Sequence, residues 1–101
     1  MIDFENIIGF DWDDFNLHKN WNKHSVHWTE CEEIFFNKPL VVNYDFLHSE
    51  SENRYFVLGR TSLNRKLFLV FTLRNDKIRI ISSRDMNKKE KIEYEKHTKI
   101  Q

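Results

Sequence analysis

Four arginine residues lie at the ends or on the faces of predicted strands and are the first candidates for chemistry. They are Arg54, Arg60, Arg79 and Arg84. A guanidinium group stays charged at neutral pH, and its planar fork can bind two oxygen atoms of one phosphate or carboxylate group. Adjacent antiparallel strands can bring several such groups onto one surface. The positions of these residues therefore predict a phosphate-binding site on a sheet.

Arg79 has a second interpretation. Strict alternation in the run KIRIISSR, residues 77–84, places Ile78, Ile80 and Ser82 on one face and Arg79, Ile81 and Ser83 on the other. A guanidinium group buried without a partner would cost on the order of several kcal/mol, comparable with the whole stability of a small domain. Arg79 must therefore reach water, line a cleft, or form an ion pair with a carboxylate from the first half of the chain.

The charge is unevenly distributed along the sequence, although 16 basic and 16 acidic residues balance overall. Residues 1–59 carry four basic and eleven acidic residues, a net charge of −7, whereas residues 60–101 carry twelve and five, a net charge of +7. The second part is expected to offer a cationic surface to a polyanion. In the alternative interpretation, the two parts neutralise each other in the folded protein.

Two helices are predicted in the N-terminal part of the chain. Asp13 or Asp14 can cap a helix over residues 14–24, because a carboxylate accepts hydrogen bonds from the free N–H groups of a first turn. Thr29 and Glu32 have the spacing of a capping box, which predicts a short second helix.

Strand-like runs follow. They are residues 40–44, 54–60, 66–74 and 77–84, with a further short edge strand at 10–12. The run 66–74 is apolar on both faces, as in a central strand, and Asn75 and Asp76 fit a two-residue hairpin turn. From Asn87 a third helix is predicted, with Glu90 at its N3 position. The predicted fold class is α+β, with N-terminal helices, an antiparallel meander and a C-terminal helix in one domain, residues 1–101.

Composition argues against several other classes of protein. No apolar run approaches the roughly 18 residues that cross a bilayer, and the acidic N-terminal stretch differs from a basic signal peptide. The single cysteine, Cys31, excludes an internal disulfide and agrees with a reducing compartment, so a cytoplasmic location is expected. The spacing of His24, His27 and Cys31 would suit zinc on one continuous helix. The capping signature at Thr29 predicts a break between them, so no metal or cofactor is expected.

Four segments, in order and at compatible spacing, resemble one protein family. They are FDWD at 10–13, NKHSVHW at 22–28, ENRYFVLG at 52–59, and IRIISSR at 78–84 followed by KKEKIEYE. Over about residues 10–95 the chain resembles the BrnT family of bacterial type II toxins. The resemblance implies a RelE-like ribonuclease fold, an RNA substrate and a BrnA-like antitoxin. It also implies that the protein contacts operator DNA only indirectly, through the antitoxin. Ser25 stands where the family commonly has glycine, and His27-Trp28 replace Ser-Phe; both differences affect the turn more than the charged residues.

The family's charged and polar signature marks candidate site residues. The expected catalytic residues are His24, Arg54, Arg79, Arg84 and Glu90. The expected RNA-binding residues are Lys23 and Tyr94, which match this signature, together with the basic residues Arg60, Lys88 and Lys89, which are not part of it. These sets suit metal-independent cleavage in which the ribose 2′-OH attacks its neighbouring phosphate, because the enzyme then supplies cations and proton transfer but no nucleophile. Arg79 and Arg84 are expected to clamp the scissile phosphate and His24 to transfer a proton. Each of three residues also has a purely structural interpretation. In it, His24 caps carbonyl groups at a helix end, Glu90 is an N3 cap and Tyr94 packs in the core.

Two other functions compete with the endoribonuclease. One is a catalytically silent module that binds its antitoxin and co-represses the operon, and the other is a non-catalytic RNA-binding domain. The antitoxin is expected to cover the cationic cleft with an acidic or amphipathic segment. Alternatively, it docks on the aromatic helices around Trp21, Trp28 and Phe35. No helix-turn-helix pattern is visible, so direct DNA binding is not expected.

Overall fold

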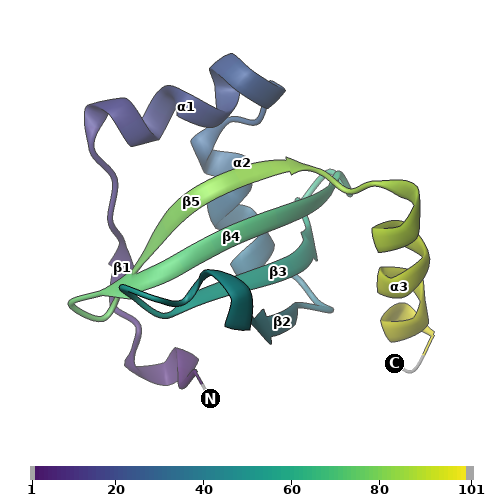
Figure 1. Cartoon of the computed structure of the whole chain (residues 1–101). Helices are drawn as coiled ribbons and strands as arrows, with labels where there is room; N and C mark the ends of the chain where they lie inside the picture. The colour runs from purple at the N-terminus through teal and green to yellow at the C-terminus, as the bar shows by residue number, and fades with distance from the viewer. Residues whose placement is uncertain (1, 100–101) are drawn as a thin grey trace.

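A five-stranded mixed sheet lies at the centre of the computed structural model, which describes residues 2–99 (Figure 1). Its strands are β1 (Gly9–Phe10), β2 (Val41–Tyr44), β3 (Arg54–Arg60), β4 (Lys66–Arg74) and β5 (Lys77–Asp85), in the spatial order β1-β5-β4-β3-β2. The helices are α1 (Asp14–His24), α2 (Trp28–Glu33) and α3 (Lys88–Thr98). Short 3₁₀ turns occupy Phe4–Asn6, Ile34–Phe36 and Phe46–His48. None of the helices in residues 2–99 is long and apolar enough to span a membrane.

The predicted α+β class and the order of its elements are confirmed. Strands β2 to β5 form the expected antiparallel meander, and the β4–β5 hairpin turns through Asn75 and Asp76, both at positive φ (52° and 63°). The short edge strand β1 pairs in parallel with the start of β5, which makes the sheet mixed. The RelE-like label stays a prediction.

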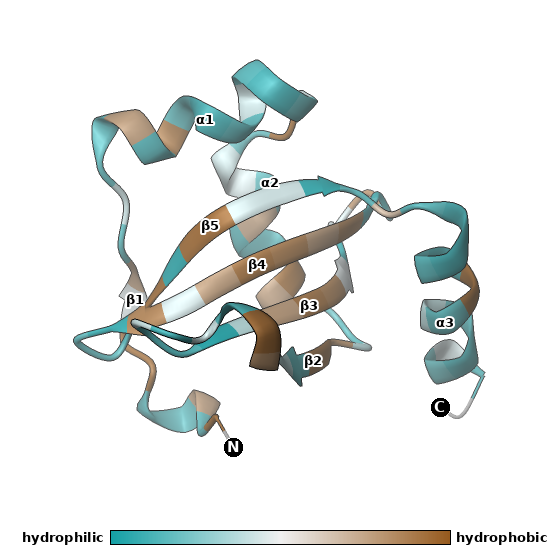
Figure 2. Cartoon of the chain, viewed as in Figure 1, coloured by the Kyte–Doolittle hydropathy of each residue, from teal (hydrophilic) through white to brown (hydrophobic). Residues whose placement is uncertain are grey.

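One face of the sheet is covered by α1 and α2 and holds the main core. Figure 1 shows α2 behind the sheet and α1 beside β5. Cys31 and Ile34 pack there against Val57, Leu69 and Phe71, and all five side chains are fully buried. In Figure 2 the hydrophobic colour runs along β4, which is the central strand, as its two apolar faces predict.

The opposite face, which we call the open face, carries α3 at one end (Figure 1). A second buried cluster of Leu58, Met86 and Tyr94 fixes α3 to the sheet. The Tyr94 hydroxyl donates a hydrogen bond of 2.6 Å to the carbonyl oxygen of Pro39. In Figure 1 the 3₁₀ turn Phe46–His48 lies in front of β3 on this face, and the Thr72 side chain near the other end is only 1% exposed.

The helix caps agree with the sequence at two of three positions. Asp13 caps α1 through the backbone N–H of Asn16, and Asn87 and Glu90 form the capping box of α3. The predicted box of Thr29 and Glu32 is wrong, because His27 caps α2 with Glu30 at N3. Glu32 instead accepts a hydrogen bond of 2.9 Å from the Trp12 indole, which ties α2 to the chain before α1.

A β-bulge in β5 changes the faces on which its later residues point. Phe71 pairs with Ile80 and Val70 pairs with Ser82, so Ile81 is an extra residue without a partner on β4. The alternation expected from the sequence is therefore wrong after Ile80. Ser82 shares the open face with Arg79, while Ser83 points into the core and is fully buried.

Polar side chains of α1 satisfy the backbone groups around this bulge. The amide group of Asn16 donates to the carbonyl of Ile80 (2.7 Å), and Lys19 donates to the carbonyl of Ile81 (2.8 Å). The side-chain oxygen of Asn20 accepts from the N–H of Ser83 at 3.0 Å. Asparagine therefore occupies the buried positions of α1, because backbone groups released by a bulge need partners when they are buried.

Arg65 joins three elements at the end of β5. Its guanidinium binds Asp85 (2.7 Å) and Glu30 (3.1 Å), and it also donates to the carbonyl oxygen of Ser25. The hydrogen bond from Arg65 lowers the pKa of Asp85 below its ordinary value of 3.8. This network links the end of α1, the start of α2 and the end of β5.

Replacing Arg65 by alanine is expected to destabilise the protein by about 2 kcal/mol, because several charge-assisted hydrogen bonds are lost at once. For a domain of this size that change lowers the melting temperature by about 10 °C. Because the pKa of Asp85 is depressed, its contribution is complete above 3.8 and is lost as the pH falls through the folded-state pKa. The difference in melting temperature between the wild type and Arg65→Ala should therefore become smaller at acidic pH.

Thermal unfolding measured across pH 3 to 7 checks this expectation. Arg74→Ala is the matched control, since Arg74 makes a single exposed ion pair with Glu52 (3.4 Å) and should change stability by less than about 1 kcal/mol. Equal melting temperatures for both variants would contradict the role given to Arg65.

Candidate functional site

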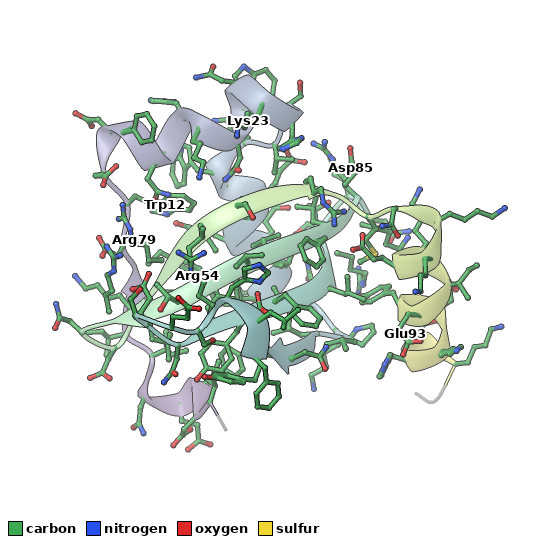
Figure 3. The ribbon with its side chains drawn as sticks, viewed as in Figure 1. Trp12, Lys23, Arg54, Arg79, Asp85 and Glu93 are labelled. Atoms are coloured by element: carbon green, nitrogen blue, oxygen red, sulfur yellow. The ribbon has the colours of Figure 1, made fainter. Side chains whose placement is uncertain are left out.

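Two arginines face the same way at one end of the open face. Arg54 on β3 and Arg79 on β5 both pair in register with Thr72 on β4, so the three side chains form a row across the sheet. Figure 3 shows Arg54 and Arg79 at the same end of the strands, away from α3. We call these three residues the arginine row.

The two guanidinium groups of the arginine row differ in their partners. Arg79 forms ion pairs with Asp13 (2.7 Å) and Asp11 (3.7 Å), so the ion-pair alternative weighed from the sequence is present. Hydrogen bonds from the Asn16 N–H and from Arg79 lower the pKa of Asp13. The Arg54 guanidinium has no hydrogen-bond or ion-pair partner among residues 2–99, which leaves all of its donors available to a ligand.

Arg84 lies at the other end of the open face, where it pairs in register with Phe68. Its guanidinium stacks 4.2 Å from the centre of the Phe68 ring and donates two hydrogen bonds to the Glu90 carboxylate, at 2.8 and 3.0 Å. The hydrogen bond with Glu90 raises the pKa of Arg84. Burial raises the pKa of Glu90, but hydrogen bonds from Arg84 and the Asn87 N–H outweigh burial and lower it. The Arg84–Glu90 pair is therefore charged at neutral pH.

The arginine row and Arg84 are separated along the strands. Thr72 and Phe68, their partners on β4, are four residues apart, which corresponds to about 13 Å of extended strand. The row Phe56–Val70–Ser82 lies between them on the same face. The structure thus does not bring Arg79 and Arg84 together as a clamp on one phosphate, and offers instead two cationic positions along one surface.

Lys23 and His24 lie in the last turn of α1, near the end of β5. Figure 3 shows Lys23 on α1, beyond the β5 edge of the sheet. The His24 carbonyl oxygen accepts a hydrogen bond of 3.4 Å from Arg65, which is bound to Asp85, the residue after Arg84. The side chains of Lys23 and His24 are both exposed. His24 is therefore nearer in the fold to the Arg84 end of the open face than to the arginine row.

The remaining residues expected to bind RNA are distributed around α3. Lys88 and Lys89 are exposed in its first turn, beside Glu90. Arg60 donates to the carbonyl of Lys38 (2.8 Å) and lines a separate hollow with Tyr94, so it lies beyond α3 from the arginine row. Tyr94 is fully buried and burial raises the pKa of its hydroxyl, so in this structure it packs α3 and presents no surface to RNA.

The zinc alternative fails on geometry. α1 ends at His24 and α2 begins at Trp28, so the continuous helix that would align the three ligands does not exist. Cys31 is fully buried in the core, where burial raises the pKa of its thiol to about 11, while His24 and His27 are exposed. Within residues 2–99, no three histidine, cysteine or acidic side chains converge on a position suited to a metal ion.

Sequence reasoning missed the aromatic residues of the open face. Phe56 on β3 and Phe68 on β4 stack with ring centres 5.9 Å apart; Phe68 lies beside Arg84, and Phe56 lies between the two cationic positions. Strict alternation along RYFVLGR puts Arg54, Phe56 and Leu58 on one face, so the pattern that would have found Phe56 is present in the sequence.

Comparison with known proteins gives one finding. The family described as "Ribonuclease toxin, BrnT, of type II toxin-antitoxin system" matches residues 12–90. This segment contains the arginine row, Arg84, His24 and Glu90. A search of curated proteins returns no match.

Proposed function

The chain belongs to the BrnT family of ribonuclease toxins of type II toxin–antitoxin systems, and from this premise we propose that it cleaves single-stranded RNA on the open face of its sheet. The observation that carries the proposal is the arginine row on the face opposite to α2, with an Arg54 guanidinium that has no hydrogen-bond or ion-pair partner among residues 2–99. RNA would lie along the strands, with one phosphate at the arginine row and another at Arg84. The separation of about 13 Å between the two positions suits neighbouring parts of one extended chain.

The proposed chemistry takes place at the Arg84 end. The ribose 2′-oxygen attacks the adjacent phosphorus and the bond to the 5′-oxygen breaks, which leaves a 2′,3′-cyclic phosphate and a 5′-hydroxyl end. Arg84 stabilises the negative charge on the phosphate oxygens in the transition state, and Glu90 holds its guanidinium in place. His24 either takes the proton from the 2′-hydroxyl or supplies the proton to the leaving 5′-oxygen, and water exchanges the other proton. Arg54, Arg79, Lys23 and Lys89 bind the backbone.

The proposed setting is the cytoplasm, with a BrnA-like antitoxin as the partner and operator DNA contacted only through it. We expect the antitoxin to cover the open face, since the charge of +7 on residues 60–101 complements an acidic or amphipathic segment. Association should then slow as salt rises, and a short non-cleavable RNA should compete with the antitoxin. Stopped-flow binding with and without that RNA checks this expectation. Salt-insensitive association without competition would favour docking elsewhere, around Trp21, Trp28 and Phe35.

The experiment that tests the proposed activity uses purified protein and single-stranded RNA in EDTA. Cleavage that leaves 2′,3′-cyclic phosphate ends supports a metal-independent endoribonuclease. RNA binding without cleavage supports an RNA-binding domain, and the absence of both refutes the proposal.

One observation favours a catalytically silent antitoxin-binding module as the second candidate. Arg79 and Arg84 are both neutralised by carboxylates of the chain itself, through Asp13 and Glu90. A protein that only binds its antitoxin would keep these ion pairs permanently. An Asp13→Asn variant separates the two functions, because freeing Arg79 should strengthen RNA binding only if RNA uses this face.

Replacing Arg54 by alanine is expected to weaken RNA binding and to leave the chemical step almost unchanged. One lost phosphate contact reduces the slope of log affinity against log salt by about 0.7 for a single strand. Stability should change by less than about 0.5 kcal/mol, because Arg54 has no side-chain hydrogen bond or ion pair among residues 2–99 that would be lost. Binding titrations of a non-cleavable RNA at several salt concentrations provide the measurement.

Lys38→Ala is the control for this prediction, since Lys38 is an exposed cation beyond α3, beside Arg60. It should leave the salt slope as in the wild type. Equal slopes for the wild type and Arg54→Ala would remove Arg54 from the RNA-binding surface.

A further inference from the structure

We propose that the groove between α3 and the open face binds one nucleobase of the RNA, stacked on Phe56; this inference rests on the proposed function. The groove has a volume of about 800 Å³. Its floor includes Phe56, Phe68 and Asn43 from the sheet, and its wall includes Lys89, Ile92 and Glu93 from α3. Figure 3 shows Glu93 on the helix that forms this wall.

The aromatic residues supply a stacking surface. The Arg84 guanidinium lies over the Phe68 ring, 4.2 Å from its centre. The Phe68 ring also stacks with the Phe56 ring, at an interplanar angle of 25°. Phe56 is therefore the outer member of a continuous stack that begins at Arg84. Half-buried on the floor of the groove, it is the ring on which a further planar group extends the stack. Every nucleobase has a flat π-face that suits this position, and stacking on an aromatic side chain contributes about 1–3 kcal/mol per base.

The position of Phe56 relative to the cations identifies the occupant. Phe56 pairs in register with Val70, which lies between Thr72 of the arginine row and Phe68, the partner of Arg84. A ligand on Phe56 is thus flanked along the strands by two phosphate-binding positions. A single-stranded nucleic acid alternates charged phosphates with flat bases, whereas an apolar peptide would offer no anion to the free donors of Arg54.

Asn43 gives the groove a means of selecting between bases. It pairs in register with Phe56 across β2 and β3, so its side chain lies on the same face beside the stacking ring. Its amide offers both a hydrogen-bond donor and an acceptor to the edge of a base. Asn43→Ala should therefore reduce the discrimination between bases more than the affinity for RNA.

The test measures binding to RNA that cannot be cut. The probe is a short single strand with 2′-O-methyl riboses, together with a set in which each nucleotide in turn is replaced by an abasic one. The wild type should lose about 5- to 100-fold in affinity when one particular base is removed. Phe56→Leu should bind the intact strand as weakly as the wild type binds that abasic strand, and should no longer distinguish the two. Phe56→Trp keeps an aromatic ring and should retain the discrimination.

Phe36→Leu is the matched control, because Phe36 is 78% exposed on the 3₁₀ turn after α2 and has no part in the groove. Equal affinity of the wild type for every abasic strand, or full discrimination by Phe56→Leu, would overturn the nucleobase site. So would a Phe56→Leu variant that binds antitoxin more weakly but RNA normally, which would make the groove a protein-docking site.

The two proposals fail separately. Cleavage in EDTA by the wild type, with no base discrimination at Phe56, overturns the nucleobase site and leaves the ribonuclease in place. Base discrimination at Phe56 without cleavage supports the nucleobase site and overturns the ribonuclease.

Discussion

Arg84→Ala is expected to cleave RNA about 100- to 1,000-fold more slowly than the wild type, because it removes the cation proposed to face the scissile phosphate. The loss should appear mainly in kcat, while the affinity for non-cleavable RNA should fall only as far as the loss of one phosphate contact requires. Arg84→Lys should also be strongly impaired, because a point charge replaces neither the two hydrogen bonds to Glu90 nor the stacking on Phe68. Single-turnover cleavage at fixed pH gives the comparison.

Stability must be excluded as the cause of the loss in Arg84→Ala. The Arg84 side chain is 37% exposed, so its ion pair and cation–π contact together contribute on the order of 1 kcal/mol. Thermal unfolding of Arg84→Ala should therefore stay within a few degrees of the wild type. Arg74→Ala removes a comparable Arg–Glu pair and should cleave normally. Normal cleavage by Arg84→Ala would contradict the role given to Arg84 and would indicate that the scissile phosphate binds at the arginine row.

Glu90 provides an internal check on this prediction, because in the proposed mechanism it contributes to catalysis through Arg84. Glu90→Gln should reduce kcat less than Arg84→Ala, since the guanidinium remains but is held less firmly. The double variant should be no slower than Arg84→Ala alone, because residues that act through one another are not additive. Additive losses would indicate a separate role for Glu90 in proton transfer.

His24→Gln is expected to slow cleavage by about 100- to 10,000-fold, the usual contribution of general acid–base catalysis. The wild-type pH–rate profile should contain a limb that depends on the His24 imidazole as the proton-transfer group. That limb should be absent from the variant, whose amide cannot replace the imidazole in proton transfer. Single-turnover rates between pH 5 and 9 supply both profiles.

His18→Gln is the control for His24, since His18 is exposed on the same helix and lies more than one turn earlier in the chain. It should cleave with the wild-type profile. If His24→Gln also keeps that profile, the proton transfer belongs to another group, and Glu90 is the next to substitute.

The sequence alone determined the elements of this protein and their order. Strand-like runs over 54–60, 66–74 and 77–84, and the turn at Asn75-Asp76, predicted the sheet with nearly the observed bounds. The helix caps formed by Asp13 and by Asn87 with Glu90 could also be predicted from the sequence. These features depend on neighbours within a few residues, which a sequence displays directly. The arginines that matter for the candidate site were found in the same way, from their positions on strands.

Only the tertiary structure decided which of those residues share a surface. The bulge at Ile81 reverses the alternation of β5, so Arg84 points to the open face with Arg79, where strict alternation would have turned it into the core. The backbone around that bulge is bound by Asn16, Lys19 and Asn20 of α1, residues more than 60 positions away in the chain. A cap or a turn is stabilised by near neighbours in the sequence, whereas the backbone of a bulge depends on the elements that pack against it. The face to which Arg84 points is therefore visible only in the tertiary structure.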